Sequence, residues 1–492
     1  MLAIERRGAV SGNSTQQSPH STVAVVGGGA AGSLFALKLA RAKPEASVIL
    51  IERRRRPGRG LAYGACAPHH LLNVPVSRME VGLEPRFADW LLQRRDAIQE
   101  ALAESGGDLQ SAFVSRELFG QYVQERVEAS AGPGNARGLR IVRGEAVKLL
   151  DHPARGVLLE DGREIFADKI VLATGNLPPR PLSSPDPWLY DTANFISNPW
   201  ARDAFDGLEP DAPVLIVGAG LTMVDIALKL AADGHRGPML AFSRHGLIPQ
   251  THAGGGSWEP FLKADATTPR QVVRDIRTEI SRALAMGIPW QRVIDAVRPS
   301  IARVWTNWSL SQRRAFLRHL RSRWDVIRHR MAPRVSVRLH ALIESGQLRV
   351  LAGRLRGYVA YRQGVEAVIA RRGGGEERFH AVRVINCTGP RSDLAVIAFP
   401  LLADLRRRGL IVPDPLALGV ETADCAAVDS SGTPSRWLFA LGALTRPSWW
   451  EITSIPEINT QIERLVSALS AVPGAAPLPL LAEEFVDLGV GI

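Results

Sequence analysis

The sequence has 492 residues, 46% of them hydrophobic, which is enough for about three domains with buried cores and excludes a disordered or fibrous protein. A net charge of +11 is typical of proteins that bind nucleic acid, but the arginines are dispersed along the chain, so we expect no nucleic-acid partner. The three cysteines (Cys66, Cys387 and Cys425) indicate a reducing compartment without disulfides, and no apolar run reaches membrane-spanning length, which favours the cytoplasm and no membrane contact.

A first strand, loop and helix follow residues 1–20, which lack the apolar core of a signal peptide and which we expect to be a flexible tail. The β-branched run Thr22–Val26 leads directly into a glycine-rich loop, and residues 34–40 have a helical pattern. Glycines in such a loop permit a tight turn, the approach of backbone N–H groups to a pyrophosphate, and close packing of helix on strand. The sequence predicts a dinucleotide site, the alternative being a glycine-rich turn in an ordinary α/β unit. The expected contacts are Gly27, Gly29, Ala30, Ala31 and Gly32.

An acidic residue ends the second predicted strand, SVILIE. Glu52 lies 20 residues beyond Gly32, where a carboxylate can hydrogen-bond an adenosine ribose and repel a 2′-phosphate. Arg53 begins a run of four arginines that would lie near the adenine end of the site, although a solvated loop is the favoured interpretation of this run.

The chain that leaves Glu52 must pass along the bound cofactor. Within residues 58–78 we expect Arg59 and Gly60 to contact the phosphates, and Asn73, with Pro75, to reach the reactive ring. An asparagine there could hydrogen-bond a flavin carbonyl or a peroxide, so Asn73 is a catalytic candidate; closing a turn is the alternative.

Two similar segments suggest an internal repeat. Residues 141–175 have the pattern of a hairpin meander followed by a hydrophobic strand that ends in Thr174 and Gly175. Residues 348–389 repeat this pattern and end in Thr388 and Gly389. We expect all four of these end residues to contact cofactor.

A second glycine loop follows the predicted strand Val214–Val217. Gly218 and Gly220 occupy the first two glycine positions, but Met223 stands in the third, so the helix must pack differently while the phosphate contacts survive. The expected cofactor contacts of this loop are Gly218, Gly220, Leu221 and Thr222.

The strand after the second loop, in PMLAFSRHG, ends in Arg244 and His245 instead of an acid. A guanidinium at this place suits a 2′-phosphate, which favours NADPH over NADH. A solvated arginine at a strand end is the alternative.

Residues 265–345 differ in character from the rest of the chain. The pattern from Pro269 to Leu342 is helical and basic, with four tryptophans, and predicts an insertion. It could form a substrate lid, although a helix core made of the tryptophans is favoured. Arg328, His329 and Arg330 could meet an anionic substrate, but a solvated helix face is the preferred interpretation.

A third strand with a glycine end, residues 437–444, precedes a predicted helix that begins at IPEINTQ. Gly442 is expected to contact cofactor, and the positive end of the helix dipole would face a flavin. Trp450 and Glu451 lie just before the helix and are catalytic candidates; capping or surface roles are the alternative for Glu451.

The two glycine loops together resemble those of two-dinucleotide flavoproteins. More narrowly, GRGLAYGACAPHHLLNVPVSRMEVG, CTGPRSDL and GALTRPSWWEITSIPEINTQ look like a bacterial family of FAD/NAD(P)-binding proteins, similar to class B flavin monooxygenases and N-hydroxylases. The resemblance covers roughly residues 21–475 and implies FAD on the first loop and a nicotinamide cofactor in the domain of the second loop, where Arg244 favours NADPH. One departure is Ala443, where many relatives have an aspartate that holds the ribityl chain.

The implied fold class is α/β, with two Rossmann-like dinucleotide-binding domains, the nicotinamide domain inserted in the FAD domain, and a helical insertion at about 265–345. The expected boundaries are 21–195 for the first part of the FAD domain, 196–379 for the nicotinamide domain, 380–475 for the second part of the FAD domain, and 476–492 for a C-terminal tail.

Three functions are consistent with the sequence. The first is an NADPH-using monooxygenase that oxygenates a small nitrogen or sulfur nucleophile through a peroxyflavin; the second is a flavin reductase or dehydrogenase that passes electrons to a partner; the third is a thiol redox enzyme that uses Cys66. The lack of a closely spaced cysteine pair disfavours a dithiol reductase, and no group of residues has metal-ligand spacing, so we expect no metal. A homodimer is compatible with all three functions.

Overall fold

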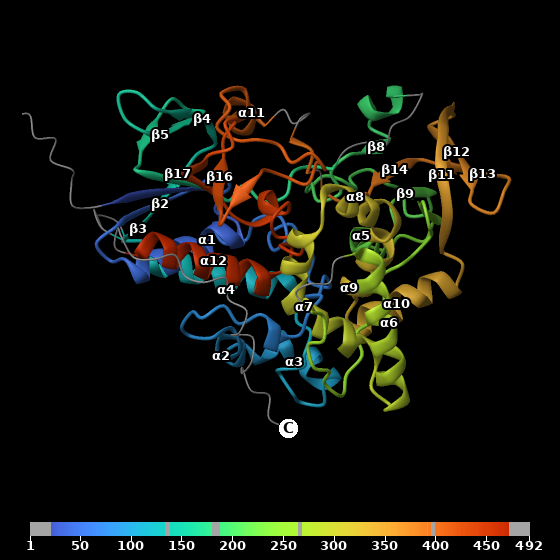
Figure 1. Cartoon of the computed structure of the whole chain (residues 1–492). Coiled ribbons are helices and arrows are strands. Elements are labelled where there is room, and N and C mark those ends of the chain that lie inside the picture. The colour runs from blue at the N-terminus through green and yellow to red at the C-terminus, as the bar shows by residue number, and fades with distance from the viewer. Residues whose placement is uncertain are drawn as a thin grey trace, which may run out of the picture.

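The computed structural model describes residues 21–132, 138–179, 187–263, 268–390, 392–394 and 399–471; both expected tails, 1–20 and 476–492, lie outside these ranges. Two seven-stranded sheets lie side by side, and a small three-stranded sheet packs beside the first (Figure 1). Helices cover both large sheets. The expected α/β class with two dinucleotide-binding folds is confirmed.

The first sheet has the order β15-β16-β17-β7-β1-β2-β3, in which β17, β7, β1, β2 and β3 are parallel. Its strands are β1 (Thr22–Val26), β2 (Ser47–Glu52), β3 (Gly138–Arg143), β7 (Lys169–Leu172), β15 (Thr422–Ala423), β16 (Ala426–Val428) and β17 (Pro434–Ala440). Strands from both ends of the chain therefore complete one sheet, as the resemblance implied.

One face of the first sheet is covered by helices that pack around α1 (Figure 1). These are α1 (Ala30–Ala42), α2 (Phe87–Leu92), α3 (Arg95–Glu104), α4 (Arg116–Ser130) and α12 (Ile455–Ser470), with the short turn η1 (Val76–Arg78) beside them. The opposite face is covered by β4 (Ala146–Leu150), β5 (Gly156–Leu159), β6 (Glu164–Phe166) and α11 (Pro400–Arg407). The sheet is buried on both sides, which explains why its central strands are uniformly apolar.

The second sheet has the order β13-β12-β11-β10-β9-β14-β8. Its strands are β8 (Phe195–Ile196), β9 (Val214–Val217), β10 (Met239–Ser243), β11 (Leu348–Tyr361), β12 (Gly364–Arg371), β13 (Glu376–Ala381) and β14 (Arg383–Asn386). The turn η2 (Pro187–Asp191) precedes β8, and α5 (Leu221–Ala232) and α10 (Pro333–Glu344) pack on the sheet. The seven strands between residues 195 and 386 thus form one sheet, which lies in the sequence between the two parts of the first sheet.

One expected boundary needs correction. Because β14 pairs in parallel with β9 and β8, the return to the first sheet cannot begin at residue 380. The strand that precedes Thr388 and Gly389 belongs to the second sheet. The first helix after it that packs on the first sheet is α11.

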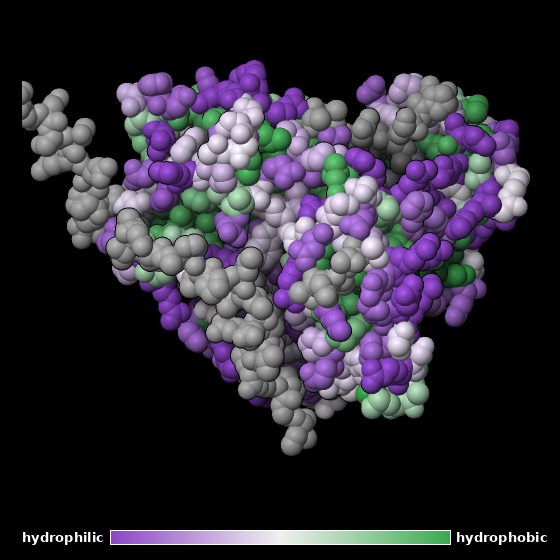
Figure 2. All heavy atoms as spheres, in the orientation of Figure 1, coloured by the Kyte–Doolittle hydropathy of each residue, from purple (hydrophilic) through white to green (hydrophobic). Residues whose placement is uncertain are grey.

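The helical insertion has a core of its own. It consists of α6 (Pro269–Ala285), α7 (Trp290–Asn307), α8 (Leu310–His319) and α9 (Arg321–Arg328). Trp305 and Trp308 are buried there, together with Leu418 and Trp450 from the last part of the chain. The tryptophans therefore form helix core, the favoured of the two interpretations. In Figure 2 hydrophilic side chains cover much of the surface over the insertion and the strands β11–β13. In the described part of the chain, no helix is long and apolar enough to cross a bilayer.

The two glycine loops repeat one backbone contact. A Cβ atom on Gly27 (φ +107°) would lie 2.3 Å from the carbonyl oxygen of Ala173, and one on Gly218 (φ +115°) would lie 2.4 Å from that of Cys387. Each loop thus packs directly on the end of a neighbouring parallel strand, β7 or β14, and the repeat seen in the sequence is structural.

We predict that Gly27→Ala destabilises the fold by about 3 kcal/mol or more, because it combines a left-handed backbone conformation with a clash against backbone. Chemical denaturation measures the loss. The control is Gly373→Ala, since no heavy atom lies within 4 Å of the added Cβ and the backbone is not left-handed. Equal stability of the two variants would contradict this explanation of the loop.

Candidate cofactor and substrate site

The first loop presents a helix start without a side-chain cap. Gly29 is the N-cap of α1, with φ −70° and ψ −174°, a conformation that any residue adopts. A Cβ there would meet only the Cα of Gly60, at 3.5 Å. Neither conformation nor packing requires glycine, although serine or aspartate is the usual N-cap. A ligand that approaches the free N–H groups, such as a phosphate, explains the choice.

Glu52 is held against this loop. Its Oε2 accepts a hydrogen bond from the Gly28 N–H at 2.7 Å, and its Oε1 accepts one from the Arg54 N–H at 2.7 Å. Arg53 is directed elsewhere and pairs with Glu145 at 3.1 Å. The structure therefore brings the carboxylate to the loop as expected, but not the first arginine of the run.

Three further expected contacts gather at the loop. Gly60 (φ +55°) lies against Gly29, whereas the neighbouring Arg59 donates to Gln124 of α4 at 2.6 Å. The hydroxyl of Thr174 is buried beside Gly27 without a hydrogen-bond partner in the described residues, so it is free for a ligand. The exposed Gly175 follows it.

Gly442 begins the turn η4 (Gly442–Thr445) and approaches the start of α1. A Cβ on Gly442 would lie 3.6 Å from that of Ala31. Its N–H is already bound to the side chain of Gln461 at 2.8 Å, and Gln461 also donates to Thr445 at 2.7 Å. Sequence reasoning missed this fully buried glutamine, which fixes α12 against the strand end.

The second loop has the same form as the first. Gly220 caps α5 with φ −87° and ψ −168°, and apart from its chain neighbours no described residue has a heavy atom within 4 Å of a Cβ placed there. Leu221 and Thr222 begin the helix. Thr388 lies beside Gly218, and its hydroxyl donates to Asn386 at 2.7 Å. Thr388 therefore lies at the second loop, and Gly389 follows it.

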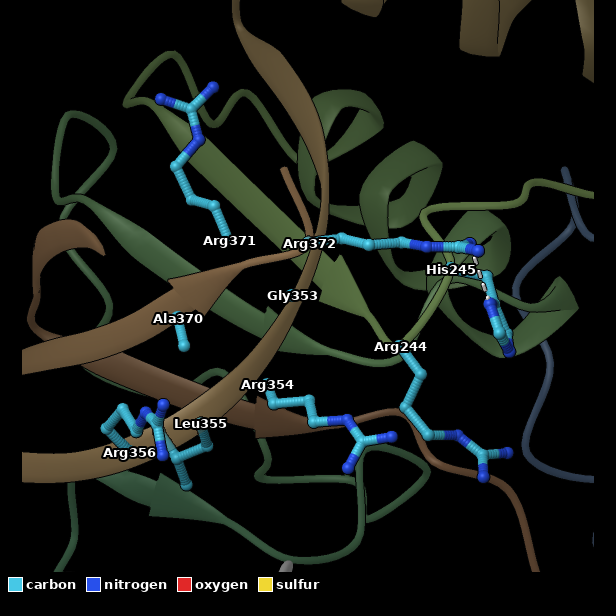
Figure 3. A pocket seen from close by; sticks show the side chains of 9 residues that line it. All are labelled: Arg244, His245, Gly353, Arg354, Leu355, Arg356, Ala370, Arg371 and Arg372. Carbon is cyan, nitrogen blue, oxygen red and sulfur yellow. Dashed lines mark hydrogen bonds between the residues drawn. The ribbon is translucent and has the colours of Figure 1, made fainter. Parts of the chain in front are cut away.

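A basic pocket of about 550 Å³ lies at the edge of the second sheet where the second glycine loop begins (Figure 3). Register places the ends of β9 and β10 together, and Ser243 opposite Ala352 of β11. Arg244 and Arg354 extend in the same direction in Figure 3, whereas Arg371 points away from them. The complete lining is Arg244, His245, Gly353, Arg354, Leu355, Arg356, Ala370, Arg371 and Arg372.

The arginines of this pocket help to lower the pKa of His245. Partial burial and the guanidiniums of Arg372 and Arg244 lower the pKa of His245, and its Nδ1 lies 3.0 Å from the guanidinium of Arg372. A neutral imidazole can accept that hydrogen bond. The pocket thus concentrates positive charge without an acidic residue in its lining, as an anion site requires.

An ion pair joins the two dinucleotide-binding folds. Arg116, at the start of α4, reaches Asp225 of α5 with contacts of 2.7 and 3.3 Å, and its Nε donates to the carbonyl of Leu71 at 2.8 Å. His70 adds a contact to the Asp225 carbonyl at 3.1 Å. The fork geometry fixes the orientation of the second glycine loop relative to the first.

At Asn73 the segment after residue 58 meets the chain between β10 and α6. The Asn73 carbonyl accepts a hydrogen bond from Nε2 of His252 at 2.8 Å, while no hydrogen bond within the described residues engages its side-chain amide. Burial, and then Arg330, lower the pKa of His252 to about 4, so the ring is neutral at pH 7. The catalytic assignment of Asn73 stays a prediction.

The other two catalytic candidates are buried against the insertion. Trp450 is 2% exposed and stacks on Trp305 with ring centroids 4.5 Å apart. Glu451 accepts a hydrogen bond from the Trp324 indole at 2.6 Å and pairs with Arg328 at 3.2 Å. These contacts give both residues a role in holding the insertion, and their catalytic assignments stay predictions.

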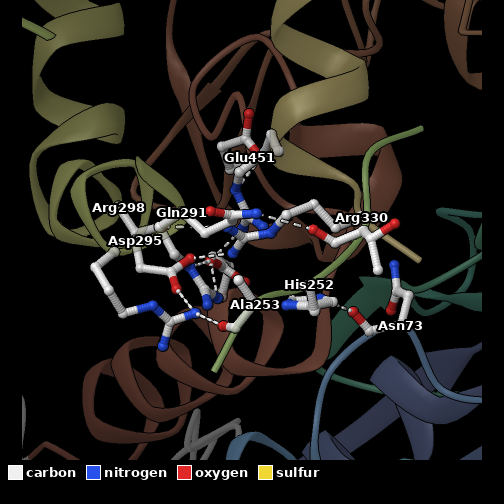
Figure 4. Close-up of polar contacts among 12 residues, drawn as sticks. Asn73, His252, Ala253, Gln291, Asp295, Arg298, Arg330 and Glu451 are labelled. Atoms are coloured by element: carbon white, nitrogen blue, oxygen red, sulfur yellow. Dashed lines mark hydrogen bonds and ion pairs between the residues drawn. The ribbon is translucent and has the colours of Figure 1, made fainter. Parts of the chain in front are cut away.

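Arg328 and Arg330 are 6% and 2% exposed, so the preferred interpretation of them as a solvated helix face is wrong. They belong to a network of charges that sequence reasoning missed (Figure 4). It joins α7, α9 and the first turn of α12 through Arg292, Asp295, Arg298, Arg328, Arg330 and Glu457. One clue was available: the segment 268–345 contains sixteen arginines, five acidic residues and no lysine.

Comparisons with known proteins agree with this architecture. Residues 24–177 match the model of a family described as FAD-NAD(P)-binding. No curated protein sequence gives a significant match.

Solved structures resemble most of the chain. Ornithine N-hydroxylase of Kutzneria sp. 744 has a TM-score of 0.60 at 15% identity, over 92% of this chain and 100% of that one. L-lysine 6-monooxygenase of Pseudomonas syringae has 0.61 at 16%, over 92% and 99%. The cadaverine monooxygenase of Erwinia amylovora, solved with FAD, has 0.58 at 14%, over 94% and 99%. At these identities the likeness establishes a shared fold.

We predict that Gly29→Val abolishes FAD retention, because its side chain would occupy the space that a pyrophosphate needs, while the stability of the FAD-free chain falls by only about 1 kcal/mol. The flavin absorbance per chain after purification measures retention. The control is Gly254→Val, at another glycine with open space around it. Stoichiometric FAD in Gly29→Val would show that the cofactor lies elsewhere.

Proposed function

We propose that the chain is an FAD-dependent, NADPH-using oxidoreductase, and that it is a monooxygenase acting on a small nitrogen or sulfur nucleophile. The observation that carries the proposal is the pair of uncapped helix starts at Gly29 and Gly220, one beside an acidic residue and the other beside a basic pocket. Two dinucleotides of different charge fit these two sites.

FAD fits the first loop. Glu52 would hold the adenosine ribose, the N–H groups at the start of α1 would hold the pyrophosphate, and the buried hydroxyl of Thr174 offers a further hydrogen bond. Gly442 lies beside Ala31, so the rest of the cofactor would extend from there toward Asn73 and the start of α12.

NADPH fits the second loop. The start of α5 would receive its pyrophosphate, and Arg244 with Arg354 would receive its 2′-phosphate. The ion pair between Arg116 and Asp225 would hold this site at a constant orientation toward the flavin. NADH would leave the basic pocket empty.

Bound FAD would accept a hydride from NADPH and activate O₂, which supplies the oxidising chemistry. The protein would orient the cofactors and exclude water. The side-chain amide of Asn73 is free to hydrogen-bond the flavin edge, and the insertion, anchored by Trp450 and Glu451, would close the substrate side. Amine N-oxygenation is supported by the likeness to the ornithine, lysine and cadaverine enzymes described above.

The alternatives differ in support. A reductase that passes electrons to a partner uses the same two sites, and only kinetics separates it from a monooxygenase. A thiol mechanism is disfavoured because burial raises the pKa of the Cys66 thiol, whereas a reactive thiolate needs a lowered pKa. We place the enzyme in the cytoplasm because its cysteines are free.

The decisive experiment reduces the flavin anaerobically with NADPH and then mixes it with O₂. A monooxygenase should show a transient absorbing species before oxidised flavin returns, and a candidate amine should yield a hydroxylamine while the release of hydrogen peroxide falls. Asn73→Ala should shorten the lifetime of that species. Immediate return of oxidised flavin, with one peroxide per NADPH whatever amine is added, would favour the reductase.

The basic pocket yields a test of donor preference. Arg244→Gln should raise the apparent Michaelis constant for NADPH about ten- to a hundredfold, the value of a lost charge-assisted phosphate contact, and leave that for NADH nearly unchanged. Steady-state kinetics with both donors measures this. The control is Arg371→Gln, whose side chain points away (Figure 3). Equal losses with both donors would mean that Arg244 serves only the fold.

A further inference from the structure

The junction between the insertion and the FAD-binding fold holds more positive than negative groups. Five guanidiniums and three carboxylates lie there. The cations are Arg78, Arg292, Arg298, Arg328 and Arg330, and the anions are Asp295, Glu451 and Glu457. His252, which borders the group, is neutral at pH 7.

Each carboxylate of this group is already committed. Asp295 pairs with both Arg292, at 3.0 Å, and Arg330. Glu457 is shared by Arg298, at 2.6 Å, and Arg328, at 3.0 Å. Glu451 pairs with Arg328 and accepts from an indole, as described above. No carboxylate of the group is left for a further cation.

Arg78 is the cation without a partner. In the described part of the chain its guanidinium has no ion pair and no side-chain hydrogen bond, and it remains open to solvent. Partial burial, and then the charge of Arg298, lower the pKa of Arg78, while the charges of Asp295 and Glu457 oppose this shift. A second sign of incompleteness is the buried Nε of Arg292 and of Arg330, which lack hydrogen-bond partners among the described residues. Such unmet donors cost about 1–3 kcal/mol each unless a ligand binds them.

The position of this group relates it to the reaction. Arg78 ends η1, five residues beyond Asn73, on the segment that leaves Glu52. Arg298 and Arg328 hold Glu457 in the first turn of α12, the helix that packs along α1. An anion at Arg78 would therefore lie between the proposed flavin site and the insertion.

We infer that the substrate carries a carboxylate, and that Arg78 binds it with help from Arg292 and Arg298. The inference rests on the proposed function for the location of the reaction, but the anion site itself rests on the charges alone. A planar guanidinium matches a carboxylate in a two-pronged contact. The phosphates of NADPH are accounted for by the start of α5 and the pocket at Arg244, so they need no third site. A simple diamine would add charge of the wrong sign.

Binding of matched five-carbon probes tests the inference. The oxidised full-length protein, without NADPH, is titrated at constant ionic strength with glutarate, glutaramide and cadaverine, and heat or the shift in melting temperature is recorded. Glutarate should bind saturably in the millimolar range, equivalent to about 4 kcal/mol, and the neutral and cationic probes should not.

Variants assign the contact. Arg78→Gln should weaken glutarate binding about ten- to a hundredfold, and Arg78→Lys should restore part of it, since it keeps the charge but not the fork. Arg274→Gln, an exposed residue of α6, removes an equal charge and should bind glutarate as the wild type does.

Three results would overturn the inference: no saturable glutarate binding up to about 20 mM, equal binding in Arg78→Gln, or competition between glutarate and NADP⁺, which would assign the anion to the nucleotide. None of these measurements involves O₂ or turnover. Failure of the monooxygenase proposal would leave them unchanged, so the two proposals can fail separately.

Discussion

The backbone contact between each glycine loop and the end of a neighbouring parallel strand determines where everything else lies. Gly27 meets Ala173, and Gly218 meets Cys387, at distances that leave no room for a Cβ atom. These contacts aim the first turns of α1 and α5 at open space. The glycines that then face that space, Gly29 and Gly220, have ordinary backbone angles and room for a side chain. The fold explains the first pair of glycines, and we propose that a bound phosphate explains the second.

The charges around the two loops differ because different strand ends approach them. β2 ends in Glu52, whose carboxylate accepts a hydrogen bond from the Gly28 N–H. Arg244 directly follows β10 and lies beside further arginines from β11 and β12. At the junction with the insertion, arginines outnumber acids in a largely buried network. Such a network is costly when it is only partly satisfied, and we propose that a ligand completes it.

The sequence contained most of the information needed for local structure and less of that needed for long-range contacts. Both strand-loop-helix units and both meanders could be predicted, because apolar β-branched runs and glycine spacing reflect local backbone demands. Pairing could not: β14 has the same pattern as β7, and only register with β9 shows that it belongs to the second sheet. The burial of charge could not be predicted either, because Arg328 and Arg330 lie in a basic segment that resembles a solvated helix face. Their partners are Glu457, which is distant in sequence, and Asp295, which lies on another helix. Gln461 could not be found for the same reason.

The central claim is that one chain holds two dinucleotides at once, FAD at Gly29 and NADP(H) at Gly220. The most direct measurement is a titration of the purified yellow protein with NADP⁺, with FAD content and NADP⁺ binding recorded together. The account predicts one retained FAD per chain and one NADP⁺ bound without loss of flavin. Release of FAD by NADP⁺, or a single dinucleotide per chain at saturation, would contradict it.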